Sequence, residues 1–181
     1  MKRPGAEKLY ASRIDLTPNT RAAVAEILNE TLAITLDLWT QTKQAHWNVK
    51  GRDFYQLHLL FDEIAGELDG YIDMVAERVT ALGGVAMGTV KMAAGRTILP
   101  EYPHEAIDGE EHVSALSERV AIYAQHVRRN IDRSAELSDQ DTADLYTEIS
   151  RTIDKRLWFL ESHLVGTKHE AKTKEPVGSS S

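Results

Sequence analysis

The sequence contains no cysteine, which excludes disulfides, thiolate metal sites and thiol nucleophiles. It has no apolar run of about 18 residues, so no membrane span is expected. The first residues, MKRPGAEKLYASR, lack the apolar segment of a secretory signal. We therefore expect a cytoplasmic protein with no membrane partner.

What is present is the composition of an ordinary globular protein. Hydrophobic residues make up 42% and charged residues 27% of 181 residues, enough for one domain with a core. The formal net charge is −7, so the overall field of the protein does not attract nucleic acid. Any DNA binding would have to come from a local basic patch or tail.

Capping and turn signals predict two long helices in the first half of the chain. Thr17 before Pro18 is typical of a helix start, and this helix should reach about Asn48. Asp53 is the expected cap of a second helix, which should end near the Gly83-Gly84 pair.

The second half predicts two more long helices after a connection over residues 85–107. This connection should carry a short helix around Val90–Ala94. Asp108 with Glu111 has the spacing of a capping box, and Asp139 is the expected cap of the last helix.

These elements predict an all-α fold with one domain. Four long helices with a long crossover between the second and third describe a ferritin-like four-helix bundle. The bundle is expected over residues 17–165, after a flexible N-terminal segment over 1–16 and before a disordered C-terminal tail over 166–181.

The second helix carries two different stripes. At about 100° per residue, with His58 at zero, its apolar residues fall between roughly 200° and 320° and form the core face. His58, Asp62, Asp73 and Glu77 fall between roughly 0° and 100°, and therefore point out of their own bundle. A solvated face is the ordinary explanation of such a stripe.

The spacing of the four polar residues favours a metal site shared by two molecules. They form two pairs, each one turn apart, of the imidazole and carboxylate groups that suit ferrous iron or zinc. The pairs lie about 16 Å apart along the axis, so one metal ion cannot touch both. An antiparallel copy of the helix would bring the pairs together twice, and Gly66 and Gly70 on either side of the midpoint would allow close approach.

His46 completes this candidate set. It lies just before the predicted turn and His58 lies a similar distance after it, so the two should sit at one level of an antiparallel hairpin. The alternative is a cap or a surface residue, the commoner role of a lone histidine near a helix end.

The motifs resemble those of the Dps family, the miniferritins. The resemblance rests on TKQAHWNVKG, His58-x3-Asp62, Asp73-x3-Glu77, Arg78 with LGG, and DTADLYTEISRTIDKRLWFLES, and it covers roughly residues 15–165. It implies a dodecamer with ferroxidase sites at the two-fold interfaces. His46, His58 and Asp62 would come from one subunit, and Asp73 and Glu77 would come from its partner.

The resemblance also implies a function. Such a protein oxidises Fe(II) at a site for one or two irons, with hydrogen peroxide or oxygen, and stores ferric mineral in a hollow shell, which protects DNA. Zinc fits the same ligands. Trp47 would take up stray oxidising equivalents, or else pack at an interface. Asp139, Asp144 and Glu148 would line a three-fold pore, although acids at a helix start also complement the helix dipole.

Two other functions compete with iron oxidation. A DNA-compacting protein of the nucleoid would use basic residues in the two tails, namely Lys2, Arg3, Lys8, Lys168, Lys172 and Lys174. A di-metal enzyme acting on an organic substrate would need ligands inside one bundle, which the outward stripe opposes.

Trp39 and Trp158 are expected in the core or an interface. The remaining histidines have no partner at ligand spacing and are expected at the surface or an interface: His104, His112, His126, His163 and His169.

Overall fold

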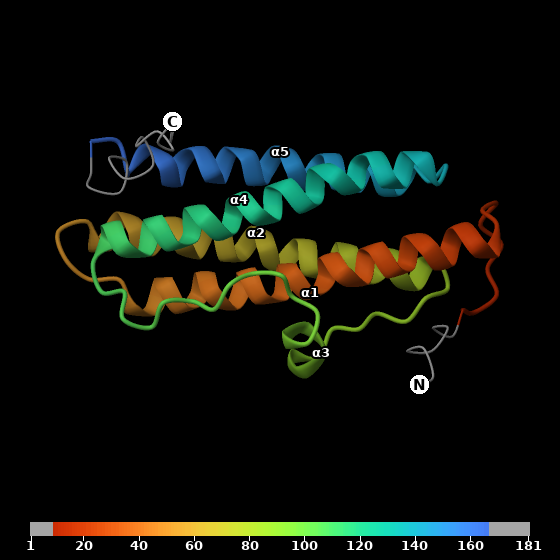
Figure 1. The fold of residues 1–181 in the computed structure, drawn as a ribbon, viewed down its shortest axis with the longest axis horizontal. Helices are drawn as coiled ribbons and strands as arrows, with labels where there is room; N and C mark the ends of the chain where they lie inside the picture. Colours follow the sequence, from red (N-terminus) through yellow and green to blue (C-terminus); the bar gives the residue numbers. More distant parts are fainter. Residues whose placement is uncertain (1–8, 167–181) are drawn as a thin grey trace, which may run out of the picture.

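The computed structural model describes residues 9–166, and within this range the only regular elements are α-helices (Figure 1). The predicted all-α bundle with a short helix in its crossover is confirmed. The helices are α1 (Pro18–Asn48), α2 (Phe54–Ala81), α3 (Val90–Ala94), α4 (Gly109–Glu136) and α5 (Gln140–Ser162).

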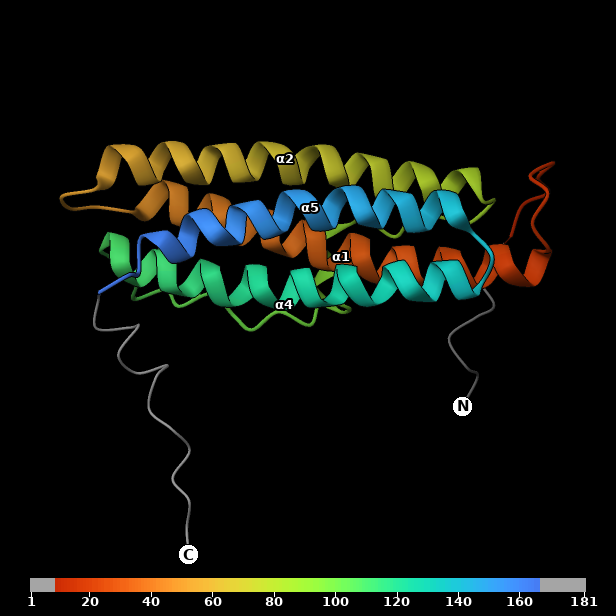
Figure 2. The same ribbon diagram turned by 90° about the horizontal axis from the view of Figure 1, so that it is seen from above.

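The long helices form two antiparallel hairpins joined by the crossover, residues 82–108, which runs back along the bundle (Figure 1). The helix α1 packs against α2 and α4, and α5 packs against α4 and α2. Therefore α2 lies diagonally across the bundle from α4, as Figure 2 shows from above. No helix in residues 9–166 is long and apolar enough to cross a membrane.

Local signals explain most helix ends. The hydroxyl of Thr17 accepts from the backbone N–H of Thr20, and Pro18 follows it in the first turn. The predicted capping box of Asp108 and Glu111 is present at the start of α4. These helices begin where a side chain accepts a hydrogen bond from a backbone N–H that has no partner within the helix.

The predicted cap at Asp53 is only partly right. Asp53 occupies the cap position of α2, but its side chain makes no cap hydrogen bond. Its ψ of 20° differs from the extended backbone that lets a side chain reach back to the next turn. Instead the carbonyl of Gly51 accepts from the N–H of Phe54 at 3.2 Å, so the turn itself closes the helix start.

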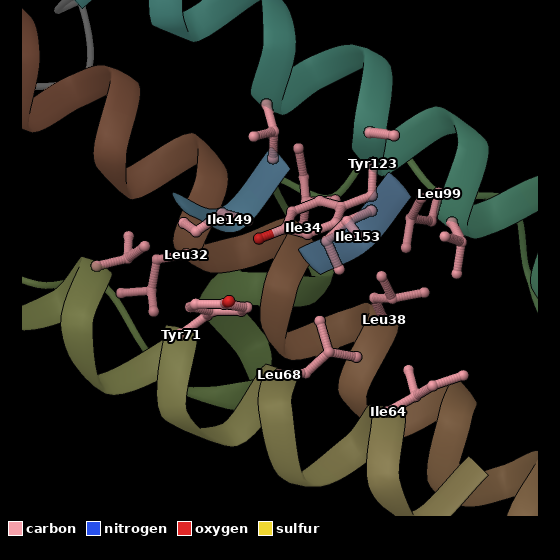
Figure 3. Close-up of a cluster of buried hydrophobic side chains, with 14 of the residues drawn as sticks. Leu32, Ile34, Leu38, Ile64, Leu68, Tyr71, Leu99, Tyr123, Ile149 and Ile153 are labelled. Carbon is pink, nitrogen blue, oxygen red and sulfur yellow. The ribbon is translucent and has the colours of Figure 1, made fainter. Parts of the chain in front are cut away.

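The core lies between the four long helices and holds the apolar stripes (Figure 3). Phe61, Leu68 and Val75 of α2 are fully buried, which confirms the predicted core face of that helix. Trp39 is half-buried against this core. Trp158 is 63% exposed in the subunit, so the core alternative for it is wrong, because it lies on the outer side of α5.

The segment before α1 contacts the bundle. Residues 9–16 have no regular secondary structure, and their flexibility stays a prediction. The N–H of Tyr10 donates to the carbonyl of Gly83, Arg21 donates to the carbonyl of Tyr10, and Ile14 and Leu16 pack on the core. The predictions for residues 1–8 and 167–181 lie outside the described residues. They include Lys2, Arg3, Lys8, Lys168, His169, Lys172 and Lys174.

Candidate metal centre

The outward stripe of α2 has the orientation that its spacing predicted. Asp62, Asp73 and Glu77 are exposed and His58 is half-buried, while the opposite face of α2 fills the core. Since α2 lies at a corner of the bundle (Figure 2), this stripe lies on its outer side, with His58 and Asp62 beside the end of α1.

His46 and His58 form a closely coupled pair across the α1–α2 hairpin. Nδ1 of His46 lies 2.8 Å from the carbonyl oxygen of His58, and Nδ1 of His58 lies 2.9 Å from that of His46. The rings stack with centroids 3.8 Å apart and planes 20° from parallel. Because a carbonyl only accepts, each Nδ1 carries the proton. Each Nε2 therefore keeps a free lone pair, which is the metal-binding state of a neutral imidazole.

Asp62 lies beside this pair and is held by Lys43. Nζ of Lys43 is 2.8 Å from Oδ1 of Asp62, and Nε2 of His46 is 3.8 Å from the same oxygen. The hydrogen bond and the charge of Lys43 hold the pKa of Asp62 below its usual range. The carboxylate therefore stays ionised, as a metal ligand must.

Asp73 and Glu77 lie farther along α2 and stand apart from the first group. Neither side chain forms a hydrogen bond or ion pair within residues 9–166. Over the same range, one subunit does not bring three potential ligand groups together at one point. One chain therefore offers two incomplete half-sites rather than one complete site.

Some exposed side chains beside the stripe are apolar. Tyr55, Leu59 and Met74 are exposed on α2. A methyl group added at Gly66 or Gly70 would meet no atom within 4 Å, so these glycines leave open space on the outer face. Exposed apolar groups beside open glycines are typical of a contact surface.

The comparisons with known proteins agree with this fold. The family model for the ferritin-like domain matches residues 25–169. A relative from Agrobacterium fabrum, named DNA protection during starvation protein, is 43% identical over 157 residues, which cover 87% of this chain and 97% of the relative. The chain belongs to the Dps family. A second relative, DNA protection during starvation protein 1 from Deinococcus radiodurans, is 35% identical over a stretch that covers 77% of this chain and 67% of the relative.

Solved Dps structures superpose closely on the chain. DpsC from Streptomyces coelicolor has a TM-score of 0.85 at 36% identity, covering 92% of this chain and 97% of that chain. Dps from Vibrio cholerae has a TM-score of 0.80 at 26% identity, over 86% and 98% of the two chains. The latter is described as a member of a broad superfamily of ferritin-like diiron-carboxylate proteins.

Trp47 lies next to the imidazole half-site of this Dps chain. Its side chain is 66% exposed, and Nζ of Lys43 lies 5.9 Å from the centroid of its ring.

The predicted pore acids have different surroundings. Asp144 and Glu148 are exposed on α5. Asp139 is buried, and its carboxylate accepts from Arg78 at 2.6 Å and from the hydroxyl and N–H of Thr142 at 2.7 and 3.1 Å. The cap expected at Asp139 is therefore present, and its carboxylate is bound within the subunit, while its place in a pore stays a prediction.

Two histidines expected at the surface or an interface are instead buried in the subunit. The Nδ1 atom of His112 is 2.7 Å from the hydroxyl of Tyr102, and His126 lies in a polar network with Thr31 and Asn130. Both positions face α1 from α4. His104 and His163 are exposed.

Lys43 is a site residue that the sequence analysis missed. His46 and His58 lie at one level of the antiparallel hairpin. Lys43 lies about one turn before His46 on α1, and Asp62 lies one turn after His58 on α2, so the two are neighbours. The register of the hairpin could have identified it.

Proposed function

We propose that this chain is a ferroxidase subunit, which oxidises Fe(II) at sites shared by two subunits and stores the ferric product in a hollow dodecameric shell. The observation that carries the proposal is the division of one ligand set into two half-sites, one formed by α2 with His46 of α1 and the other by Asp73 and Glu77 of α2. The names of its Dps relatives support a role in protecting DNA.

A single two-fold axis would complete the site. Pairing His58 with Glu77 of the partner subunit, and Asp62 with Asp73 of the partner subunit, centres both pairs on the level between Glu67 and Leu68. That level lies between Gly66 and Gly70, where α2 has open space for another helix. The symmetry then forms the site twice in each dimer.

The complete ligand set can hold one or two ferrous ions. It combines two neutral imidazoles with the carboxylates of Asp62 and of Asp73 and Glu77 of the partner subunit. With one Fe(II) the carboxylates leave one excess negative charge, and with a second Fe(II) they leave one excess positive charge. Lys43 would have to release Asp62 when the metal binds, because the ammonium and the metal compete for the same carboxylate. Zinc has the same charge and accepts the same ligands.

The reaction needs one electron from each iron. Hydrogen peroxide takes two electrons and two protons and becomes two waters, so two Fe(II) become two Fe(III) without release of a hydroxyl radical. Trp47 and Leu59 flank the half-site as apolar groups that would exclude water from it. Dioxygen is the alternative oxidant.

Iron would reach the interior through a pore lined by the exposed acids of α5. Asp144 and Glu148 have the free carboxylates that a cation path needs, whereas the carboxylate of Asp139 is bound by Arg78 and Thr142. The pore proposal therefore rests on Asp144 and Glu148.

The test is anaerobic loading with Fe(II) followed by peroxide, with ferric absorbance as the signal. The double variant Asp73→Ala with Glu77→Ala should lose fast oxidation. The matched control is Asp132→Ala with Glu136→Ala, because this pair has the same spacing and is exposed on α4. Oxidation at the normal rate in the first variant would show that the site is wrong. A plasmid gel shift with the same variant would detect any DNA binding that does not depend on iron.

A further inference from the structure

A cavity of about 350 Å³ lies where α1, α4 and the crossover meet. Residues of all three segments line it: Glu26, Glu30, Ile34, Arg96, Ile98, His126 and Arg129. Its volume is at the small end of the range of pockets that bind small molecules. None of its residues belongs to the proposed iron site or pore, so the cavity needs an explanation of its own.

The lining contains one buried histidine whose protonation state its neighbours define. His126 is 3% exposed, and its Nε2 atom lies 2.9 Å from the amide nitrogen of Asn130. Nη1 of Arg133 donates to Oδ1 of Asn130 at 3.1 Å, so the amide nitrogen is the atom that faces the ring. Because this nitrogen donates, Nε2 carries no proton and the ring proton lies on Nδ1.

The other neighbours of His126 agree with this tautomer. The hydroxyl of Thr31 lies 2.9 Å from Nε2, but it donates to the carbonyl of Ile27 at 3.0 Å, so it does not compete for the lone pair. Burial, together with the charges of Arg129 and Arg133, lowers the pKa of His126 to about 4. The ring is therefore neutral at pH 7, and Nδ1–H is its single donor.

Nδ1 of His126 faces another donor. Nη2 of Arg129 lies 3.3 Å from it, and a guanidinium has only donors. Two N–H groups therefore meet, and neither satisfies the other. Arg129 is exposed and forms no ion pair with a carboxylate within residues 9–166. An acceptor with a negative charge would satisfy both groups at once.

The acids of the lining already have cationic partners. Glu26 lies 3.4 Å from Arg96, and Glu30 lies 3.7 Å from Arg133. These pairs leave the charge of Arg129 unbalanced. The same two carboxylates repel an anion with several charges, so the cavity suits an anion with one negative charge.

We propose that this cavity binds a small organic monocarboxylate. Its two oxygens accept from Nδ1–H of His126 and from the guanidinium of Arg129, and charge-assisted hydrogen bonds of this kind are the strong ones. Its apolar body packs on Ile34, which is buried, and on Ile98, which is 55% exposed. Covering Ile98 removes apolar surface from water, which favours a ligand with an alkyl chain over acetate.

The test is a titration of the assembled wild-type protein with hexanoate at pH 7, followed by methyl nuclear magnetic resonance of labelled isoleucines. The signals of Ile34 and Ile98, identified from Ile34→Val and Ile98→Val, should shift together and reach saturation. The signal of Ile64 should stay unchanged, since this residue is buried on α2 and does not line the cavity. Absence of a saturable shift at Ile34 and Ile98 overturns the inference.

Two further probes examine the chemical class of the ligand. Hexanol has the same alkyl chain without the charge, and it should bind about tenfold more weakly than hexanoate. Inorganic phosphate should not displace hexanoate, because Glu26 and Glu30 disfavour its second charge. Equal affinity for hexanol and hexanoate, or displacement by phosphate at the concentration of hexanoate, overturns the assignment to a monocarboxylate.

A matched pair of variants examines the role of Arg129. Arg129→Gln should remove the preference for hexanoate over hexanol. Arg128→Gln is the control, because Arg128 is the adjacent exposed arginine of α4 and pairs with Asp154 at 2.6 Å, outside the cavity. An unchanged preference in Arg129→Gln, or an equal loss in both variants, overturns the inference. The titrations need no iron, so their outcome is independent of the proposed function.

Discussion

His46 and His58 each donate a ring proton to the main-chain carbonyl of the other, so the two helices of the first hairpin fix the tautomer of both imidazoles. This arrangement leaves both Nε2 atoms available before any metal binds. The imidazole half-site is thus prepared by the fold of one subunit.

Replacement of either imidazole should weaken metal binding. In His58→Gln one lone pair is lost together with the bond to the His46 carbonyl. The loss in affinity should exceed the roughly 10- to 100-fold effect of removing a residue that only orients a ligand. Calorimetric titration with Zn(II), which does not change oxidation state, measures it. His163→Gln, an exposed histidine at the end of α5, is the control and should bind as the wild type does.

Removal of the Lys43 ammonium should strengthen binding at the same half-site. In Lys43→Met the carboxylate of Asp62 no longer has to be released, so we expect a modest gain in affinity, since ion pairs at the surface are weak. Lys155→Met on α5 should have no effect. A weaker affinity in Lys43→Met than in the wild type would contradict the competition between Lys43 and the metal.

The glycines of α2 should matter for assembly rather than for folding. A Cβ added at Gly70 would meet nothing within 4 Å in the subunit, so Gly70→Leu can fold, and loss of a helical glycine stabilises a helix by about 0.5 to 1 kcal/mol. We expect helical circular dichroism to be retained and light scattering to report smaller particles than in the wild type. Ala121→Leu, at an exposed position of α4, should assemble normally. Full-sized shells from Gly70→Leu would rule out close approach of two α2 helices.

Buried His126 should make folding stability depend on pH. Its pKa is lowered to about 4 in the folded chain, chiefly by burial, from the ordinary value of 6.5. The unfolded chain therefore binds a proton between these values and the folded chain does not. Stability is full above pH 6.5, falls as pH decreases towards 4, and the loss amounts to about 3 kcal/mol. Urea unfolding at pH 7 and 4.5 should show a smaller difference for His126→Gln than for the wild type.

Iron uptake should depend on the exposed acids of α5. Asp144→Asn with Glu148→Gln should slow the appearance of ferric product at low iron, since a carboxylate-lined path concentrates cations. Stopped-flow absorbance against Fe(II) concentration measures the effect, which should fade at high iron. An unchanged rate at every concentration would exclude this path.

The sequence predicted the fold and the two half-sites because both depend on spacing along a helix. The core face of α2 and its outward stripe follow from periodicity, and Asp108 with Glu111 is a local motif. Lys43, by contrast, required the register between two helices. The burial of His126 depends on which face of α4 meets α1. The missing cap hydrogen bond of the Asp53 side chain depends on the backbone conformation of the turn. The exposure of Trp158 could not be predicted, because periodicity does not distinguish an apolar face in the core from an apolar face left for another molecule.

The presence of both halves on α2 has a consequence for hybrid particles. Consider a chain lacking both imidazoles and a chain lacking both Asp73 and Glu77, each inactive when assembled alone. A mixed dimer would regain one working centre, since its first chain keeps the acids and its second keeps the histidines, while the other centre would have neither. Random co-assembly of equal amounts would therefore restore about a quarter of the normal rate.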